Sequence, residues 1–164
     1  MKRILLTVNN GYAMFGTTLY VGVLWALHFF WYPGWRKFKV DNYYDQFIPQ
    51  TTAATKFFTV VVPLMYLALT VMGISERKTR QRWLPLAGIA TLTGATAVGQ
   101  GLIIPINKIL AQGITDQDQL DGYFQRWMRY NDIRGVLMTL MWGILMYFFM
   151  AKDEPAKPPA GEQP

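Results

Sequence analysis

The chain has 164 residues, of which 52% are hydrophobic and 16% are charged, and this length leaves room for one domain. It contains no cysteine, which excludes disulfides, thiolate metal sites, iron–sulfur clusters and cysteine nucleophiles. The formal net charge of +6 would suit a nucleic-acid partner in a soluble protein, so its meaning depends on where the apolar residues lie.

Four stretches of the sequence contain no charged side chain: residues 4–35, 57–75, 83–107 and 135–151. A helix crosses the hydrocarbon of a bilayer with about 20 mainly apolar residues, and a charge at the bilayer centre costs about 2.5 to 3.5 kcal/mol. We therefore predict an all-α integral membrane protein whose domain, residues 1–151, is a four-helix bundle with spans at about 11–31, 57–74, 83–104 and 135–151. In such a chain lipid headgroups and topology signals account for the positive charge, so we expect the lipid bilayer as a partner and no nucleic acid.

The first span ends near Pro33 and Gly34, a pair that breaks helices, and it carries the single histidine of the chain, His28. On a regular helix His28 shares a face with Leu24 and Trp31. A neutral imidazole there could act as a base, bind a substrate carbonyl or ligate the metal of a haem or chlorin. It could equally form a hydrogen bond to a neighbouring helix. Because no second histidine supports ligation, we predict no cofactor and no metal site.

Small residues recur every four positions in the first and the third span. They are Thr18, Gly22 and Ala26 in the first span, and Ala87, Thr91, Ala95 and Gly99 in the third. Such stripes allow helix backbones to approach closely inside a bilayer. We therefore expect the first and third helices to pack against each other, whereas Pro63 should bend the second.

The short connection at residues 75–82 holds four basic side chains, at positions 77, 78, 80 and 82, against one acid, Glu76. Basic loops remain in the cytoplasm, and four spans place both termini on the side of this connection. We therefore expect a bacterial inner-membrane protein with both termini in the cytoplasm.

A further helix is predicted before the fourth span. Thr115 and Asp118 are typical of a helix start, and residues 120, 124, 127 and 128 are apolar at helical spacing. This amphipathic surface helix should either lie along the membrane or lead directly into the fourth span. The tail, residues 152–164, is rich in proline and charge and should be disordered on its own.

Polar and aromatic residues gather at the membrane face opposite the short connection. They are His28 and Trp31 in the first span, Gln100 and Asn107 at the end of the third, and Trp127, Asn131 and Arg134 before the fourth. Because polar groups in or near a span usually face the protein interior, we predict a pocket at this end of the bundle.

Part of this region resembles a known family. The runs PINKIL at 105–110, RW at 126–127 and NDIR at 131–134 are similar to the signature of the anthrone-oxygenase-like family of small four-helix membrane proteins, whose bacterial members mostly have no assigned function. Fungal members are associated with oxidation of anthrones to anthraquinones without an obvious cofactor. The resemblance places His28, Asn107, Trp127, Asn131 and Arg134 in such a pocket.

Two functional hypotheses follow. In the first, the pocket binds or oxidises an aromatic or quinone-like molecule, as a cofactor-independent oxygenase would. Arg134 and Asn107 would stabilise negative charge on an enolate or phenolate oxygen, and His28 would remove the proton. Substrate contacts would come from the remaining pocket residues, Trp31, Gln100, Trp127 and Asn131. In a structural alternative for the same residues, Asn107 caps the third helix and Arg134 pairs with Asp132.

The second hypothesis is a non-catalytic accessory subunit of a larger membrane complex, one that could carry pigments or redox cofactors. Its contacts with membrane protein partners would come from the aromatic helices, the surface helix and the Pro-rich tail.

Overall fold

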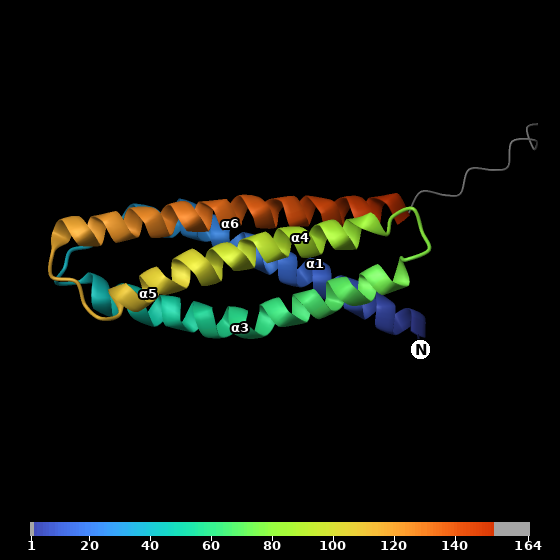
Figure 1. The fold of residues 1–164 in the computed structure, drawn as a ribbon, viewed down its shortest axis with the longest axis horizontal. Coiled ribbons are helices and arrows are strands. Elements are labelled where there is room, and N and C mark those ends of the chain that lie inside the picture. The colour runs from blue at the N-terminus through green and yellow to red at the C-terminus, as the bar shows by residue number, and fades with distance from the viewer. Residues whose placement is uncertain (1, 153–164) are drawn as a thin grey trace, which may run out of the picture.

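A computed structural model describes residues 2–152 of the chain, and every regular element in this range is helical (Figure 1). The elements are α1 (Lys2–Ala26), η1 (Leu27–Trp31), α2 (Tyr32–Trp35), α3 (Tyr43–Ser75), α4 (Trp83–Val98), η2 (Gly99–Ile103), α5 (Ile104–Leu110) and α6 (Gln117–Lys152). They form four long rods, each long and apolar enough to cross a membrane: Arg3–Trp35, Tyr43–Ser75, Trp83–Leu110 and Gln117–Lys152. The predicted all-α membrane bundle of four helices is confirmed.

The rods extend beyond the predicted spans. The first rod begins at Arg3, eight residues before position 11, the second begins at Tyr43 rather than at 57, and the third continues to Leu110. Charge-free stretches mark only the part of a helix that suits hydrocarbon, and a helix can continue into the polar interface. The helix predicted before the fourth span is present and leads directly into it, as one continuous α6. The predicted disorder of the tail concerns residues that, apart from Lys152, lie outside the described range.

Neighbouring rods run up and down in alternation, and the pairing of the first and third is wrong. α1 packs against α3 and α6, and α4 packs against the same two helices, so α1 and α4 occupy opposite corners of the bundle. Thr18 and Gly22 of the small-residue stripe in α1 are exposed. Close approach occurs instead between α1 and α3, where a Cβ on Gly16 would lie 2.9 Å from the Cγ of Met65.

The two ends of the bundle differ. The start of α1, the end of α6 and the connection at 76–82 lie together at one end, which we call the connector end (Figure 1). Here the carboxylate of Glu76 is buried and forms an ion pair with Lys152, while its second oxygen accepts a hydrogen bond of 3.0 Å from the hydroxyl of Thr79. We call the opposite end, with loops at 36–42 and 111–116, the distal end.

Buried apolar side chains form two separate clusters along the bundle. The connector-side cluster includes Met65, Leu69, Leu92, Met138 and Leu145. The distal cluster is aromatic and contains Tyr32, Trp35, Phe38, Tyr43, Phe47, Ile103, Ile106, Leu110, Leu120, Phe124, Trp127 and Met128. Its rings meet edge to face, with centroids 5.1 Å apart for Trp35 and Phe47 and 5.4 Å for Trp35 and Trp127. Edge-to-face contacts fix ring orientation, so this cluster forms a rigid cap on the distal end.

Tyr43 joins the distal ends of α3 and α5. Its hydroxyl donates a hydrogen bond of 3.0 Å to the carbonyl of Leu110 and accepts one of 2.7 Å from the backbone N–H of Ile114. Between these two residues the chain turns at Gly113, which has φ +88°, a value that only glycine adopts without strain. The hydroxyl therefore satisfies two backbone groups that the end of α5 leaves without helical partners.

We predict that Tyr43→Phe lowers the free energy of unfolding by about 1 to 3 kcal/mol, because it leaves the N–H of Ile114 without its partner and the carbonyl of Leu110 with only the N–H of Gly113. The measurement is thermal or denaturant unfolding in detergent. Tyr44→Phe is the matched control, since Tyr44 is exposed and its hydroxyl forms no hydrogen bond within the described residues. Equal stability of the two variants would contradict the role of the Tyr43 hydroxyl.

Candidate functional site

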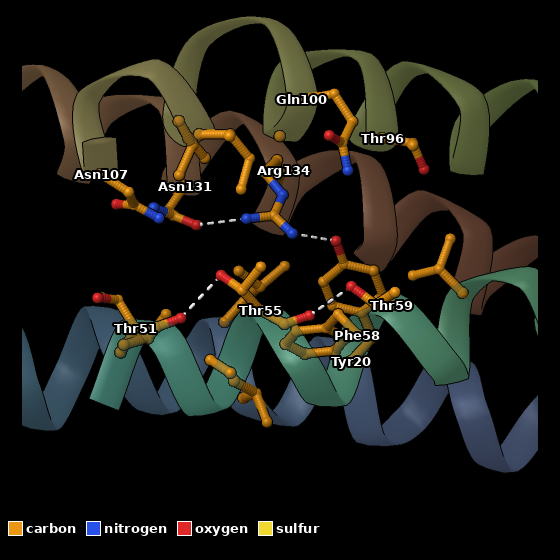
Figure 2. A pocket seen from close by; sticks show the side chains of 18 of the residues that line it. Tyr20, Thr51, Thr55, Phe58, Thr59, Thr96, Gln100, Asn107, Asn131 and Arg134 are labelled. Atoms are coloured by element: carbon orange, nitrogen blue, oxygen red, sulfur yellow. Dashed lines mark hydrogen bonds between the residues drawn. The ribbon is translucent and has the colours of Figure 1, made fainter. Parts of the chain in front are cut away.

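A cavity of about 890 Å³ lies where the two apolar clusters meet, and all four rods contribute to its walls (Figure 2). This volume is within the range of about 300 to 1,000 Å³ that is common for small-molecule sites. The aromatic cap bounds it on the distal side with Trp35 and Trp127, and Tyr66 and Thr96 bound it toward the connector end. The cavity is therefore large enough for a molecule of several fused rings.

Arg134 reaches into the middle of this cavity from α6 (Figure 2). One terminal nitrogen donates a hydrogen bond of 2.8 Å to the amide oxygen of Asn131, and the other donates to the hydroxyl of Tyr20. The Nε atom is buried without a hydrogen-bond partner in the described structure and faces Gly99, where an added Cβ would lie 3.6 Å away. The guanidinium is thus held by two neutral oxygens.

No carboxylate compensates the charge of Arg134 within the described residues. The ion pairs there join His28 with Asp132 and Lys152 with Glu76. A guanidinium has five N–H donors; two of those of Arg134 have protein acceptors and Nε is buried against Gly99, which leaves two terminal N–H groups for a bound molecule. Because a cation within a membrane bundle normally pairs with an acid or a carbonyl, this arrangement favours a ligand that carries an oxygen with negative charge.

Two π-helical turns, η1 and η2, shape the walls beside Arg134. In η1 the N–H of Tyr32 donates to the carbonyl of Leu27, and in η2 the N–H of Ile104 donates to that of Gly99. Each turn ends two residues before a proline, Pro33 or Pro105. A proline ring clashes with the carbonyl four residues earlier in a regular α-helix, and a wider turn relieves this clash. The two prolines thus account for an irregular turn beside the cavity in the first rod and another in the third.

A row of hydroxyls lines the α3 wall opposite Arg134. Thr51, Thr55 and Thr59 lie four residues apart, and each donates a hydrogen bond to the backbone carbonyl four residues earlier, at 3.0, 2.8 and 2.8 Å. Their hydroxyl protons are therefore engaged, while the oxygens remain able to accept. This wall adds polarity to the cavity without adding charge.

Asn107, Trp127 and Asn131 form a connected set at the distal side of the cavity. The indole N–H of Trp127 donates to the amide oxygen of Asn107 at 2.8 Å, and the amide nitrogen of Asn131 donates to the carbonyl of Trp127 at 3.0 Å. Asn131 is 2% exposed and uses both ends of its amide within the protein. Asn131 therefore orients Arg134. The amide nitrogen of Asn107 has no acceptor within the described residues and remains available to a ligand.

The structure brings six of the seven sequence-predicted site residues to this cavity and leaves one outside. Those that line it are Trp31, Gln100, Asn107, Trp127, Asn131 and Arg134. His28 is half-exposed on another side of η1, where its Nδ1 lies 2.9 Å from Oδ1 of Asp132 on α6. Leu24, Leu27 and Trp31 follow one another at spacings of three and four and share the face that lines the cavity, whereas His28 lies beside that face and turns toward α6.

Several cavity residues were not identified from the sequence. Tyr20, which holds Arg134, has no local signal, because its partner is 114 positions away along the chain. The spacing of Thr51, Thr55 and Thr59 is a signal that could have been read as one polar helix face. Asp132 pairs with His28 rather than with Arg134. The described residues contain no group of three or more His, Cys, Asp or Glu side chains suited to a metal ion.

Comparison of the chain with protein-family models, curated proteins and solved structures finds no match.

We predict that removing the charge of Arg134 destabilises the protein less than removing that of Lys152. Lys152→Met leaves the buried carboxylate of Glu76 without its cation, which should cost about 2 kcal/mol after allowance for the partial exposure of the pair. Arg134→Met removes no ion pair of the described chain; it leaves the amide oxygen of the buried Asn131 without its donor, a cost that removal of the unpaired charge offsets in part, so we expect a net loss of about 1 kcal/mol. Unfolding in detergent measures both, with the exposed Lys108→Met as reference; a larger loss for Arg134→Met would show that its role is structural.

Proposed function

We propose that the chain is a membrane protein that binds an aromatic or quinone-like small molecule in the cavity around Arg134. The observation that carries this proposal is the guanidinium itself, held by two neutral side chains and directed into a cavity of about 890 Å³. A buried cation without an acid costs free energy, so its presence is explained if a ligand supplies the missing negative oxygen.

The rest of the cavity supports an aromatic body for this ligand. Phe58 stacks on Tyr20 with ring centroids 4.3 Å apart, and indole rings of Trp31 and Trp127 also line the space. Such flat, polarisable surfaces favour fused rings. The likeness of the runs at 105–110, 126–127 and 131–134 to anthrone-oxygenase-like proteins supports the same class of ligand.

Oxidation of the bound molecule is the finer form of this proposal. An anthrone and dioxygen give an anthraquinone and water: the ring methylene is oxidised to a carbonyl, one oxygen atom enters it, and the other leaves as water. Arg134 would hold the ligand as its enolate, the form that gives electrons to oxygen, with the amide of Asn107 as a second donor. Since the described cavity wall contains no imidazole or carboxylate, the proton would leave to water before the enolate binds.

We also propose that the protein lies in a bacterial inner membrane with its connector end and both termini in the cytoplasm. The support is the density of basic residues in the short connection at 76–82, which the positive-inside rule assigns to that side.

Binding of a hydroxynaphthoquinone, which is ionised at neutral pH, tests the site directly. Quenching of tryptophan fluorescence should report it, because Trp31, Trp35 and Trp127 line the cavity. We expect Arg134→Gln to weaken binding by about 10- to 100-fold, the effect of a charged hydrogen bond worth about 1.5 to 3 kcal/mol. Neutral naphthoquinone should bind the wild type more weakly than the hydroxynaphthoquinone does, and its affinity should fall little in Arg134→Gln.

His28→Ala serves as the control, because His28 does not line the cavity, and its binding should equal that of the wild type. Equal affinity of the Arg134→Gln variant and the wild type for the hydroxynaphthoquinone would contradict the proposed site.

Oxygen uptake with an anthrone tests the finer proposal. We expect the rate to fall by at least 10-fold in Arg134→Ala and to stay near the wild-type value in His28→Ala, since only the first variant changes the cavity. If oxygen uptake does not exceed the rate without protein, oxidation is excluded and only the binding proposal stands. If the rate falls in His28→Ala alone, His28 is the base.

A further inference from the structure

We infer that the ligand reaches the cavity sideways, from the hydrocarbon of the bilayer, through an opening between α3 and η2. This inference rests on the proposed function, because it concerns the route to the same site. It identifies the ligand class more narrowly, as an aromatic oxygen compound that dissolves in the membrane.

Most of the exposed cavity wall lies on the α3 and η2 side. The cavity residues on α3 and η2 that are exposed are Gln50, Ala54, Thr55, Thr59, Pro63 and Gln100. On the opposite side, α1 and α6 present Tyr20, Leu24, Trp127 and Asn131, all buried, and in the first rod only Trp31 of η1, near its distal end, is an exposed cavity residue. The cavity is thus closed along α1 and α6 and most exposed between the other two rods.

The opening has a cause in the packing of α3. Near the connector end α3 and α4 touch closely: a Cβ on Gly88 would lie 3.2 Å from the Cδ2 of Leu69. At the distal end Tyr43 ties α3 to the last residue of α5. Between these contacts α3 contains Pro63 and is bowed away from α4 (Figure 1). Two fixed ends and a bend between them leave a side opening.

The opening lies at the depth of the hydrocarbon. Thr59 and Pro63 are within the charge-free stretch 57–75, and Thr96 and Gln100 are within the stretch 83–107. The outward faces of spanning helices meet lipid, so this side of the cavity meets acyl chains. The distal end, which faces water, is closed by the aromatic cap, in which Trp35 and Trp127 are buried. Access from the membrane is therefore less obstructed than access from water.

This geometry favours a ligand with an alkyl chain. The ring can occupy the cavity with its oxygen on Arg134, while the chain passes the small side chains Ala54, Thr55 and Thr59 and stays in the lipid. The hydroxyls of Thr55 and Thr59 already donate to the backbone, so an apolar chain beside them leaves no donor unsatisfied.

The test compares Thr59→Phe with Val60→Phe in lipid nanodiscs. Thr59 lines the opening, and Val60 is the next residue on α3, 62% exposed and outside the cavity wall. The probe is a hydroxynaphthoquinone with a long alkyl chain, added from vesicles, and stopped-flow tryptophan quenching gives the association rate. We expect a fall of at least 10-fold in Thr59→Phe and no change in Val60→Phe; equal rates in the two variants would overturn the inference.

Cysteine labelling gives a readout that does not depend on the probe binding, because the chain has no cysteine of its own. In nanodiscs, Thr59→Cys should react with a lipophilic maleimide and not with a charged, membrane-impermeant one. Rapid reaction with the charged reagent would show a water path and would overturn the inference. If quenching depends on Arg134 but the association rate is unchanged in Thr59→Phe, only the lateral route is contradicted. If the wild type shows no quenching, the proposed function is contradicted as well.

Discussion

The ring of a proline cannot follow a regular helical turn without meeting the carbonyl four residues earlier, and this constraint acts at Pro33 and Pro105. In both rods the chain responds with a π-turn, η1 or η2, just before the proline. Both turns lie beside the cavity: Trp31 of η1 and Gln100 of η2 line it, while His28 of η1 lies toward Asp132.

Arg134 illustrates a conflict between stability and function. A guanidinium in a membrane bundle is most stable beside a carboxylate, and the connector end shows this solution in the pair of Glu76 and Lys152. At Arg134 the neighbours are instead Asn131 and Tyr20, two neutral groups that orient the cation and leave its charge uncompensated. Such sites are retained where a ligand completes them, because the protein then binds the ligand with donors that need no rearrangement.

The cavity exists because the bundle has two cores rather than one. The connector-side cluster is mainly aliphatic and methionine side chains, with Tyr20 and Phe148 among them, whereas the distal cluster is mainly large rings. The cavity lies between these two packed regions. Membrane helices tolerate the gap because their backbone hydrogen bonds are internal, and the side that opens meets lipid.

The sequence by itself determined the class of fold: four charge-free stretches predict four spans, and spans must be helical because hydrocarbon offers no hydrogen bonds to the backbone. It also placed Asn107, Asn131 and Arg134 at one end, because spacing along a helix is a local property. Only the tertiary structure decided which helices are neighbours, since the small-residue stripes of two rods do not specify a partner. It also decided that Tyr20 holds Arg134 and that His28 pairs with Asp132 outside the cavity, because each contact joins residues that lie more than 100 positions apart in the chain.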